Sequence, residues 1–212
     1  MAQSNRFGIL TKRLTELRQH MLPKQFSPTG SYSKREEDRA RGYRLLIHAE
    51  IESYLEDISR TLVTDRIRAW KKTNTPSNLL IAFIACYHSG WIEFDDDHNL
   101  NIISLARRRS KLKDSIDEII DLAQTQFIKV LKQNHGVREK NLKSLILPTG
   151  LDLTQLNSTW ITNLDDFGKL RGEIAHQTVG ATTAINPQDE YKRVVDLLQG
   201  IKDLDQKLLN IS

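Results

Sequence analysis

Two side chains that can handle a phosphate group lie near the end of the 212-residue chain, in the stretch KLRGEIAHQ (169–177). Arg171 carries a permanent positive charge and can donate parallel hydrogen bonds to two phosphate oxygens. His176 has an imidazole that titrates near neutral pH and can accept or donate a proton. A site that holds both groups could bind a phosphodiester and move the protons of its cleavage. The simpler alternative is that both residues only complement the dipole at the C-terminal end of a helix.

The apolar pattern around this stretch predicts a helix that ends at His176 and turns one face toward the core. On that helix Arg171 and His176 lie about 140° apart around the axis, which is too far for a tight pair within one chain. A stripe of small residues, Gly168, Gly172 and Ala175, runs between them. Glycine inside a helix costs about 0.5–1 kcal/mol relative to alanine, so the stripe predicts the close approach of another backbone. We expect a two-fold homodimer interface there, where each arginine comes near the partner's histidine.

The rest of the chain predicts an all-α fold. Hydrophobic residues make up 39% and charged residues 27%, with only 10 Gly and 5 Pro, and no alternating strand pattern occurs. Because the stretch 22–33 is rich in Pro, Ser and Thr, we expect an N-terminal helical arm, made of a helix and a flexible connector (1–33), followed by a helical domain (34–212). Helices are expected over residues 5–21, 34–71, 75–90 (nearly all apolar, and so a buried central helix), 107–133, 140–147, 154–176 and 188–209.

The charge and the aromatic residues indicate how the chain could meet a nucleic acid. A formal net charge of +4 permits contact with phosphate groups without requiring it. Trp91 and Trp160 are expected to pack in the core rather than to stack on bases. One basic run could contact an RNA backbone, or could form a solvated helix face: Arg107, Arg108, Arg109 and Lys111.

Other classes of site have no support in the sequence. The single cysteine, Cys86, rules out a disulfide framework within one chain. No leader pattern is present, and no apolar run reaches the ~18 residues of a membrane span, so we expect a cytoplasmic protein with no membrane contact. The histidines and carboxylates form no ligand set such as His-Glu-x-x-His, and no glycine-rich phosphate loop follows a strand. We therefore expect no metal and no cofactor.

Three blocks, in order, resemble the RiboL-PSP-HEPN family: RGYRLLIHAEIESYLEDIS (41–59), NHGVREKNLKSLILPTGLDL (134–153) and RGEIAHQ (171–177), which has the Arg-x4-His form of the HEPN motif. The resemblance implies an HEPN-like helical bundle, a homodimer and metal-independent cleavage of RNA by attack of a ribose 2′-OH, which leaves a 2′,3′-cyclic phosphate and a 5′-OH. It implies that His176 is the general acid or base and that Arg171 holds the phosphate and stabilises charge in the transition state.

Two positions depart from the family pattern. Gly172 stands where many HEPN motifs have Asn, Asp or His, so that polar group is absent or comes from elsewhere in the fold. Thr178 stands where HEPN toxins that are neutralised by a nucleotidyltransferase partner have a tyrosine, which leaves that route of control without support.

Acidic residues on the long helix could orient the arginine or the histidine across the bundle. Of Glu50 and Glu52, Glu50 continues the apolar face of the helix and is the expected buried partner, with a purely structural ion pair as the alternative. His48 is expected to be a core or surface histidine. Asn134 and His135 are expected to cap the charged helix that they follow, with RNA contact as the alternative.

The leading hypothesis is an endoribonuclease that acts as a toxin or as an antiviral defence effector. Its partner would be RNA, with tRNA as one candidate, because unstacked loop nucleotides can reach an in-line geometry that a duplex forbids. An antitoxin or another defence-system protein would be a further partner. The alternatives are a non-catalytic HEPN scaffold that binds RNA or a partner protein, and a plain helical interaction module.

Overall fold

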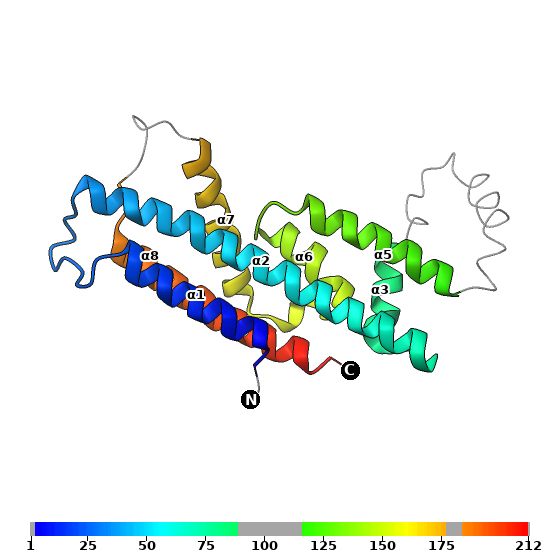
Figure 1. Cartoon of the computed structure of the whole chain (residues 1–212). Helices are drawn as coiled ribbons and strands as arrows, with labels where there is room; N and C mark the ends of the chain where they lie inside the picture. The colour runs from blue at the N-terminus through cyan, green and yellow to red at the C-terminus, as the bar shows by residue number, and fades with distance from the viewer. Residues whose placement is uncertain (1–2, 89–115, 177–183, 212) are drawn as a thin grey trace.

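The computed structural model describes residues 3–88, 116–176 and 184–211 (Figure 1). Within these ranges all regular structure is helical, which confirms the prediction of an all-α bundle. The helices are α1 (Asn5–Met21), α2 (Lys34–Thr73), α3 (Asn78–His88), α5 (Ile116–Gln133), α6 (Glu139–Ile146), α7 (Ser158–His176) and α8 (Pro187–Leu209), and two short 3-10 turns, Leu147–Thr149 and Leu153–Gln155, connect α6 to α7.

The 40-residue helix α2 is the spine of the bundle. Ser33 begins it with a capping box, in which the Ser33 hydroxyl accepts the Glu36 N–H and the Glu36 carboxylate accepts the Ser33 N–H. Asn74, in the left-handed region (φ 52°), ends it. Because an α-helix rises 1.5 Å per residue, α2 spans about 60 Å and contacts all the other described helices. Figure 1 shows α1 and α8 beside its N-terminal half and α3 and α5 beside its C-terminal half.

The first helix, α1, belongs to the same core as the rest of the bundle. Its N-terminus is held by Asp205 of α8, a fully buried carboxylate that accepts hydrogen bonds from the Ser4 N–H (2.8 Å), the Ser4 hydroxyl and the Tyr54 hydroxyl (2.8 Å). The segment that the sequence suggested as an arm is therefore anchored along α2 and α8. Its buried side chains recur at spacings of three and four: Phe7, Leu10, Leu14 and Leu17.

Helix α3 is buried on one side only. Leu79, Leu80 and Phe83 are fully buried where α3 meets α5 and the 3-10 turn after α6. Ile81 is 58% exposed, and Cys86 is also exposed. The expectation of a helix buried on all sides was wrong, because α3 lies at the end of the bundle, where the described elements cover one of its faces.

Trp160 packs inside the bundle, as expected. Its indole N–H donates to the Leu197 carbonyl on α8 (3.0 Å), and its ring lies against Gly200, where a Cβ atom would collide with it. Glycine is required at this position because α7 and α8 approach one another closely there. Trp91 lies outside the described residues.

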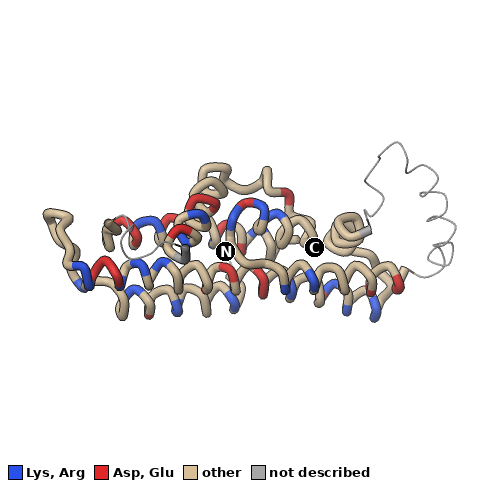
Figure 2. Tube along the Cα trace, turned by 90° about the horizontal axis from the view of Figure 1, so that it is seen from above, with Lys and Arg blue, Asp and Glu red and all other residues tan. Residues whose placement is uncertain are grey.

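Positions of basic and acidic residues are interspersed along the described helices (Figure 2). Many form ion pairs with a residue three positions away on the same helix, such as Arg60 with Asp57 and Arg68 with Asp65 on α2. Exposed pairs of this kind contribute about 0–1 kcal/mol each, so the apolar contacts dominate the stability of the bundle. None of the described helices combines the length and the apolar character that crossing a membrane requires.

Candidate functional site

Helix α7 brings Arg171 against α2. One turn before Arg171, the buried ring of Phe167 stacks on the imidazole of His48 from α2, with centroids 6.1 Å apart and an interplanar angle of 29°. Residues four apart lie on the same helix face, so Arg171 continues the face that Phe167 turns toward α2. The guanidinium charge lowers the pKa of His48, which agrees with this placement.

His48 is a buried, neutral imidazole at this contact. Its side chain is 2% exposed, and Nδ1 lies 3.4 Å from Oε2 of Glu52, one turn further along α2. Burial, and to a lesser degree the charge of Arg171, lower the pKa of His48 to about 4. At neutral pH His48 therefore carries no charge and can pack between Phe167 and Glu52.

Glu52 is an acidic residue of α2 whose carboxyl group is influenced by the charge of Arg171. Its carboxyl group is partly buried, and burial together with the nearby charge of Glu56 raises its pKa. The positive charges of Arg171 and His135 act in the opposite direction and favour the ionised carboxylate. Glu52 is thus the point where groups from α2, α7 and the turn between α5 and α6 meet.

The turn between α5 and α6 is held against α2 by the buried side chain of Asn134. Its Nδ2 donates to Oε1 of Glu56 (2.8 Å) and to the carbonyl of Gly136 (3.2 Å), while its Oδ1 accepts from Nδ2 of Asn141 (2.8 Å). All of the amide's hydrogen-bonding atoms are used within this network. The amide therefore fixes the turn, which leaves the neighbouring His135 exposed beside Glu52.

These observations place an arginine, two histidines and two carboxylates in one polar cluster: Arg171, His48, His135, Glu52 and Glu56, which we call the Glu52 cluster. Among the residues that the structure describes, no group of three or more His, Cys, Asp or Glu side chains is arranged to hold a metal ion. The chemistry that the cluster can offer is anion binding through the guanidinium and proton transfer through imidazole or carboxyl groups.

The sequence profile of the RiboL-PSP-HEPN family matches residues 9–210. The chain belongs to the RiboL-PSP-HEPN family. Neither the curated proteins nor the solved structures contained a match to it. The matched range runs from within α1 to the end of α8, so this HEPN bundle includes the N-terminal helix. Because HEPN proteins are often ribonucleases, family membership points to RNA as the partner and to ribonuclease activity as the class of function.

The two candidate acidic residues of α2, Glu50 and Glu52, have different neighbours in the structure. Glu50 forms an ion pair with Arg13 of α1 (Nε to Oε1, 3.1 Å), whereas Glu52 lies beside Arg171. Residues two apart on a helix point in nearly opposite directions, so one face of α2 meets α1 and the other meets α7. The periodicity of the sequence could not tell which of these faces the HEPN motif would approach.

The small-residue stripe on α7 has two different surroundings. At Gly168 a Cβ atom would come within 2.7 Å of Cγ of Arg138. Because Gly168 has no side chain, the turn before α6 of the same chain can pack against α7 there. At Gly172 a Cβ atom would meet nothing within 4 Å. The side chains of Ala175 and His176 lie outside what the structure describes, and so do all of the predicted RNA-binding residues Arg107, Arg108, Arg109 and Lys111.

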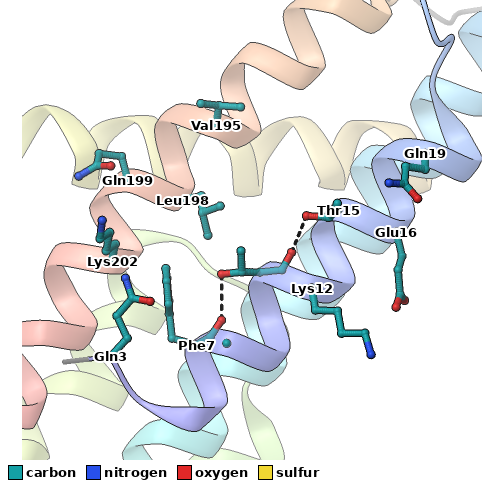
Figure 3. A pocket seen from close by; sticks show the side chains of 12 residues that line it. Gln3, Phe7, Lys12, Thr15, Glu16, Gln19, Val195, Leu198, Gln199 and Lys202 are labelled. Atoms are coloured by element: carbon teal, nitrogen blue, oxygen red, sulfur yellow. Dashed lines mark hydrogen bonds between the residues drawn. The ribbon is translucent and has the colours of Figure 1, made fainter. Parts of the chain in front are cut away.

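A hollow among the described residues lies elsewhere. It is a groove of about 750 Å³ between α1 and α8 (Figure 3), and it includes no residue of α7 or of the Glu52 cluster. On its α1 side the hydroxyls of Thr11 and Thr15 donate to the carbonyls one turn earlier, so they are engaged within the helix. The candidate site is therefore identified by the chemistry of its side chains and not by the size of a cavity.

We expect His48 to make the bundle less stable in acid. Its pKa in the folded chain is about 4, below the 6.5 of a free histidine, so between these values the unfolded chain binds the proton that the folded chain refuses. The free energy of unfolding should fall as the pH falls through this window. The total loss is about 3 kcal/mol, because each unit of pKa difference corresponds to about 1.36 kcal/mol.

Urea unfolding of the wild type and of His48→Gln at pH 7.5, 6 and 4.5 measures this effect. The stability difference between the two proteins should change by most of that amount over the range, because the variant cannot take up the proton. The exposed His20→Gln on α1 is the matched control, and its pH dependence should follow the wild type. Parallel curves for the wild type and His48→Gln would contradict the buried neutral imidazole.

Proposed function

We propose that this chain is a metal-independent endoribonuclease of the HEPN type. A ribose 2′-OH attacks the adjacent phosphate and the 5′-oxygen leaves, which yields a 2′,3′-cyclic phosphate and a 5′-OH. The observation that carries the proposal is the position of Arg171, the arginine of the Arg-x4-His motif, against the Glu52 cluster in a chain that the family profile matches over residues 9–210. The guanidinium of Arg171 carries several N–H donors that can bind phosphate oxygens.

Each motif residue has a distinct role in this reaction. Arg171 binds the non-bridging phosphate oxygens and stabilises the extra negative charge of the transition state. His176 transfers a proton at the reacting ribose or at the leaving oxygen. Glu52, in place of Glu50, orients the guanidinium, and the buried His48 fixes the carboxylate of Glu52 through the 3.4 Å contact.

The working unit is a homodimer. At 100° per residue, positions five apart such as 171 and 176 are separated by about 140° around a helix axis, so we infer that a complete site needs the histidine of a second copy. The space around Gly172, where even a Cβ atom would touch nothing, leaves room on α7 for a second α7 to approach. The stripe that serves the dimer is accordingly Gly172 and Ala175, while Gly168 serves packing within the chain.

The biological role that we infer is that of a toxin or an antiviral defence effector acting on RNA, with a tRNA loop as one candidate target. An unpaired loop can place its 2′-OH in line with the leaving oxygen. Such an activity must be restrained in the cell, by an antitoxin or by another protein of the defence system. Expression of the chain alone should slow bacterial growth, and expression of His176→Ala should not.

One observation favours a second function, a non-catalytic HEPN scaffold that binds RNA or a partner protein. Gly172 stands where many HEPN motifs place a polar residue, and nothing in the described chain fills the space around it. A site that lacks this polar group could still bind a phosphate through Arg171. RNA binding without cleavage is the result that would favour the scaffold.

The deciding experiment is cleavage of RNA by the purified chain in the presence of EDTA. We expect 2′,3′-cyclic phosphate ends, which resist 3′-end ligation until acid opens the ring and a phosphatase then removes the phosphate. The 5′-OH ends should be labelled directly by polynucleotide kinase. RNA that stays intact at every concentration of protein tested, or products with 5′-phosphate ends, would contradict the proposed function.

A further inference from the structure

The turn between α5 and α6 presents a single imidazole at the Glu52 cluster. Asn134, Gly136 and Val137 of this turn are buried, whereas His135 is exposed. The side-chain amide of Asn134 ties the turn to Glu56 of α2 and to its own backbone at Gly136. His135 is therefore carried on a rigid support, although it lies outside the helices.

The same turn also lies against α7, close to Arg171. The residues that follow His135 fill the space above Gly168, where a Cβ atom would come within 2.7 Å of Arg138. Arg138 is tied to α7 a second time through Asp165 (Nε to Oδ1, 3.1 Å). Because Arg171 lies one turn beyond Gly168 on α7, the turn carries His135 toward the same end of the cluster.

Glu52 is the common neighbour of His135 and Arg171. The positive charges of both side chains act on its carboxylate, one from the turn and one from α7. Glu56, one helical turn from Glu52, is held by Asn134, the residue next to His135. The turn that carries the exposed His135 therefore packs against both α2, at Glu56, and α7, at Gly168, one helical turn from Arg171.

The reaction proposed above needs two proton transfers. The 2′-oxygen must lose its proton as it bonds to phosphorus, and the 5′-oxygen must gain a proton as its bond to phosphorus breaks. The Arg-x4-His motif offers one titratable group near neutral pH for the two transfers, because the arginine stays protonated. A second proton-transfer group at the site would allow each transfer to be catalysed by its own residue.

We propose that His135 is this second group and donates its proton to the leaving 5′-oxygen, while His176 accepts the proton of the attacking 2′-OH. The inference rests on the proposed ribonuclease function and assigns the two transfers to separate residues. In the cycle the 2′-oxygen to phosphorus bond forms, the phosphorus to 5′-oxygen bond breaks, one proton moves to His176 and one leaves His135. Opening of the cyclic phosphate by water, or exchange with solvent, restores both imidazoles.

The test compares two substrates that differ only in the leaving atom. In one RNA the scissile 5′-oxygen is unchanged, and in the other it is replaced by sulfur, whose thiolate leaves without a proton. We expect His135→Ala to slow cleavage of the oxygen substrate by about 100-fold or more and to cleave the sulfur substrate within about tenfold of the wild-type rate. His176→Ala should be slow on both substrates, because the 2′-OH still has to lose its proton.

The matched control is His20→Ala on α1, another exposed histidine, which should cleave both substrates as the wild type does. Urea unfolding of His135→Ala should match the wild type, because the replaced side chain is exposed. If His135→Ala is as active as the wild type on the oxygen substrate, or is equally impaired on both substrates, the assignment of His135 is wrong while the ribonuclease stands. A wild-type chain that cleaves neither substrate overturns both the inference and the proposed function.

Discussion

Replacing Arg171 with alanine should lower kcat/KM for RNA cleavage by about 100- to 1000-fold, the effect of removing one group that stabilises developing charge. The guanidinium is proposed to bind the phosphate where negative charge grows, so its loss should act mainly on kcat. His176→Ala should cost about 100- to 10,000-fold, as expected for a general acid or base. Initial rates on one short RNA, with the unfolding curve and the oligomeric state of each variant, measure these effects.

The control for these variants is Lys169→Ala, which removes a cation from the same helix two residues before Arg171. Lys169 is exposed and paired with Asp165 (2.9 Å) and Asp166 (3.1 Å), so its loss should leave cleavage unchanged. Cleavage that persists at the wild-type rate in both Arg171→Ala and His176→Ala would overturn the nuclease proposal.

A mixture of the two inactive variants tests the dimer directly. If each site uses the arginine of one subunit and the histidine of the other, a dimer of Arg171→Ala with His176→Ala contains one intact site. Random exchange of subunits should then restore about a quarter of the wild-type activity. If both residues of a site came from the same subunit, the mixture would remain inactive.

Replacing Glu190 with alanine should destabilise the bundle by about 3–5 kcal/mol, because it leaves Arg44 charged, buried and without its carboxylate. Arg44 of α2 is 8% exposed and Glu190 of α8 is 2% exposed. They form two parallel hydrogen bonds, Nε to Oε2 at 2.7 Å and Nη2 to Oε1. The Nη1 atom of Arg44 also lies 3.5 Å from the Leu170 carbonyl on α7. Urea unfolding at pH 7 measures the change.

The double variant Arg44→Met with Glu190→Leu isolates the cause. Removing both charges removes the unpaired cation, so the double variant should be far more stable than Glu190→Ala, within about 1–2 kcal/mol of the wild type. Arg193, which lies 3.3 Å from Glu190, is one-third exposed and can turn to solvent. As a control, Asp65→Ala breaks an exposed pair with Arg68 and should cost less than about 1 kcal/mol. A double variant as unstable as Glu190→Ala, or less stable, would show that the unpaired charge of Arg44 is not the cause of the destabilisation.

The buried pair also links stability to the candidate site. Arg44 joins α8 to the segment of α7 that precedes Arg171. Loss of Glu190 should therefore lower the activity together with the stability, whereas the Arg171 and His176 variants should lower activity alone. This difference separates residues that hold the site from residues that perform the chemistry.

The helices themselves could be predicted from the sequence because their signals are local. The apolar spacing between Tyr43 and Ile67 lies within α2, and the predicted range 34–71 agrees with the observed helix Lys34–Thr73 to within two residues. The Arg-x4-His stretch likewise stood out from residue types and spacing alone. In both cases every residue that creates the signal lies within a few helical turns.

What the tertiary structure alone decided is which faces meet. The ion pair of Glu50 with Arg13, the packing of the turn before α6 on Gly168, and the hydrogen bond from Asn134 to Glu56 all depend on contacts between segments distant in the chain. A helical repeat states that residues four apart share a face, but it does not state which helix will cover that face. The sequence by itself determined the helices and identified Arg171 of the motif. The neighbours of Arg171 were determined only by the tertiary structure, which packs α2, α7 and the turn after α5 together near Glu52.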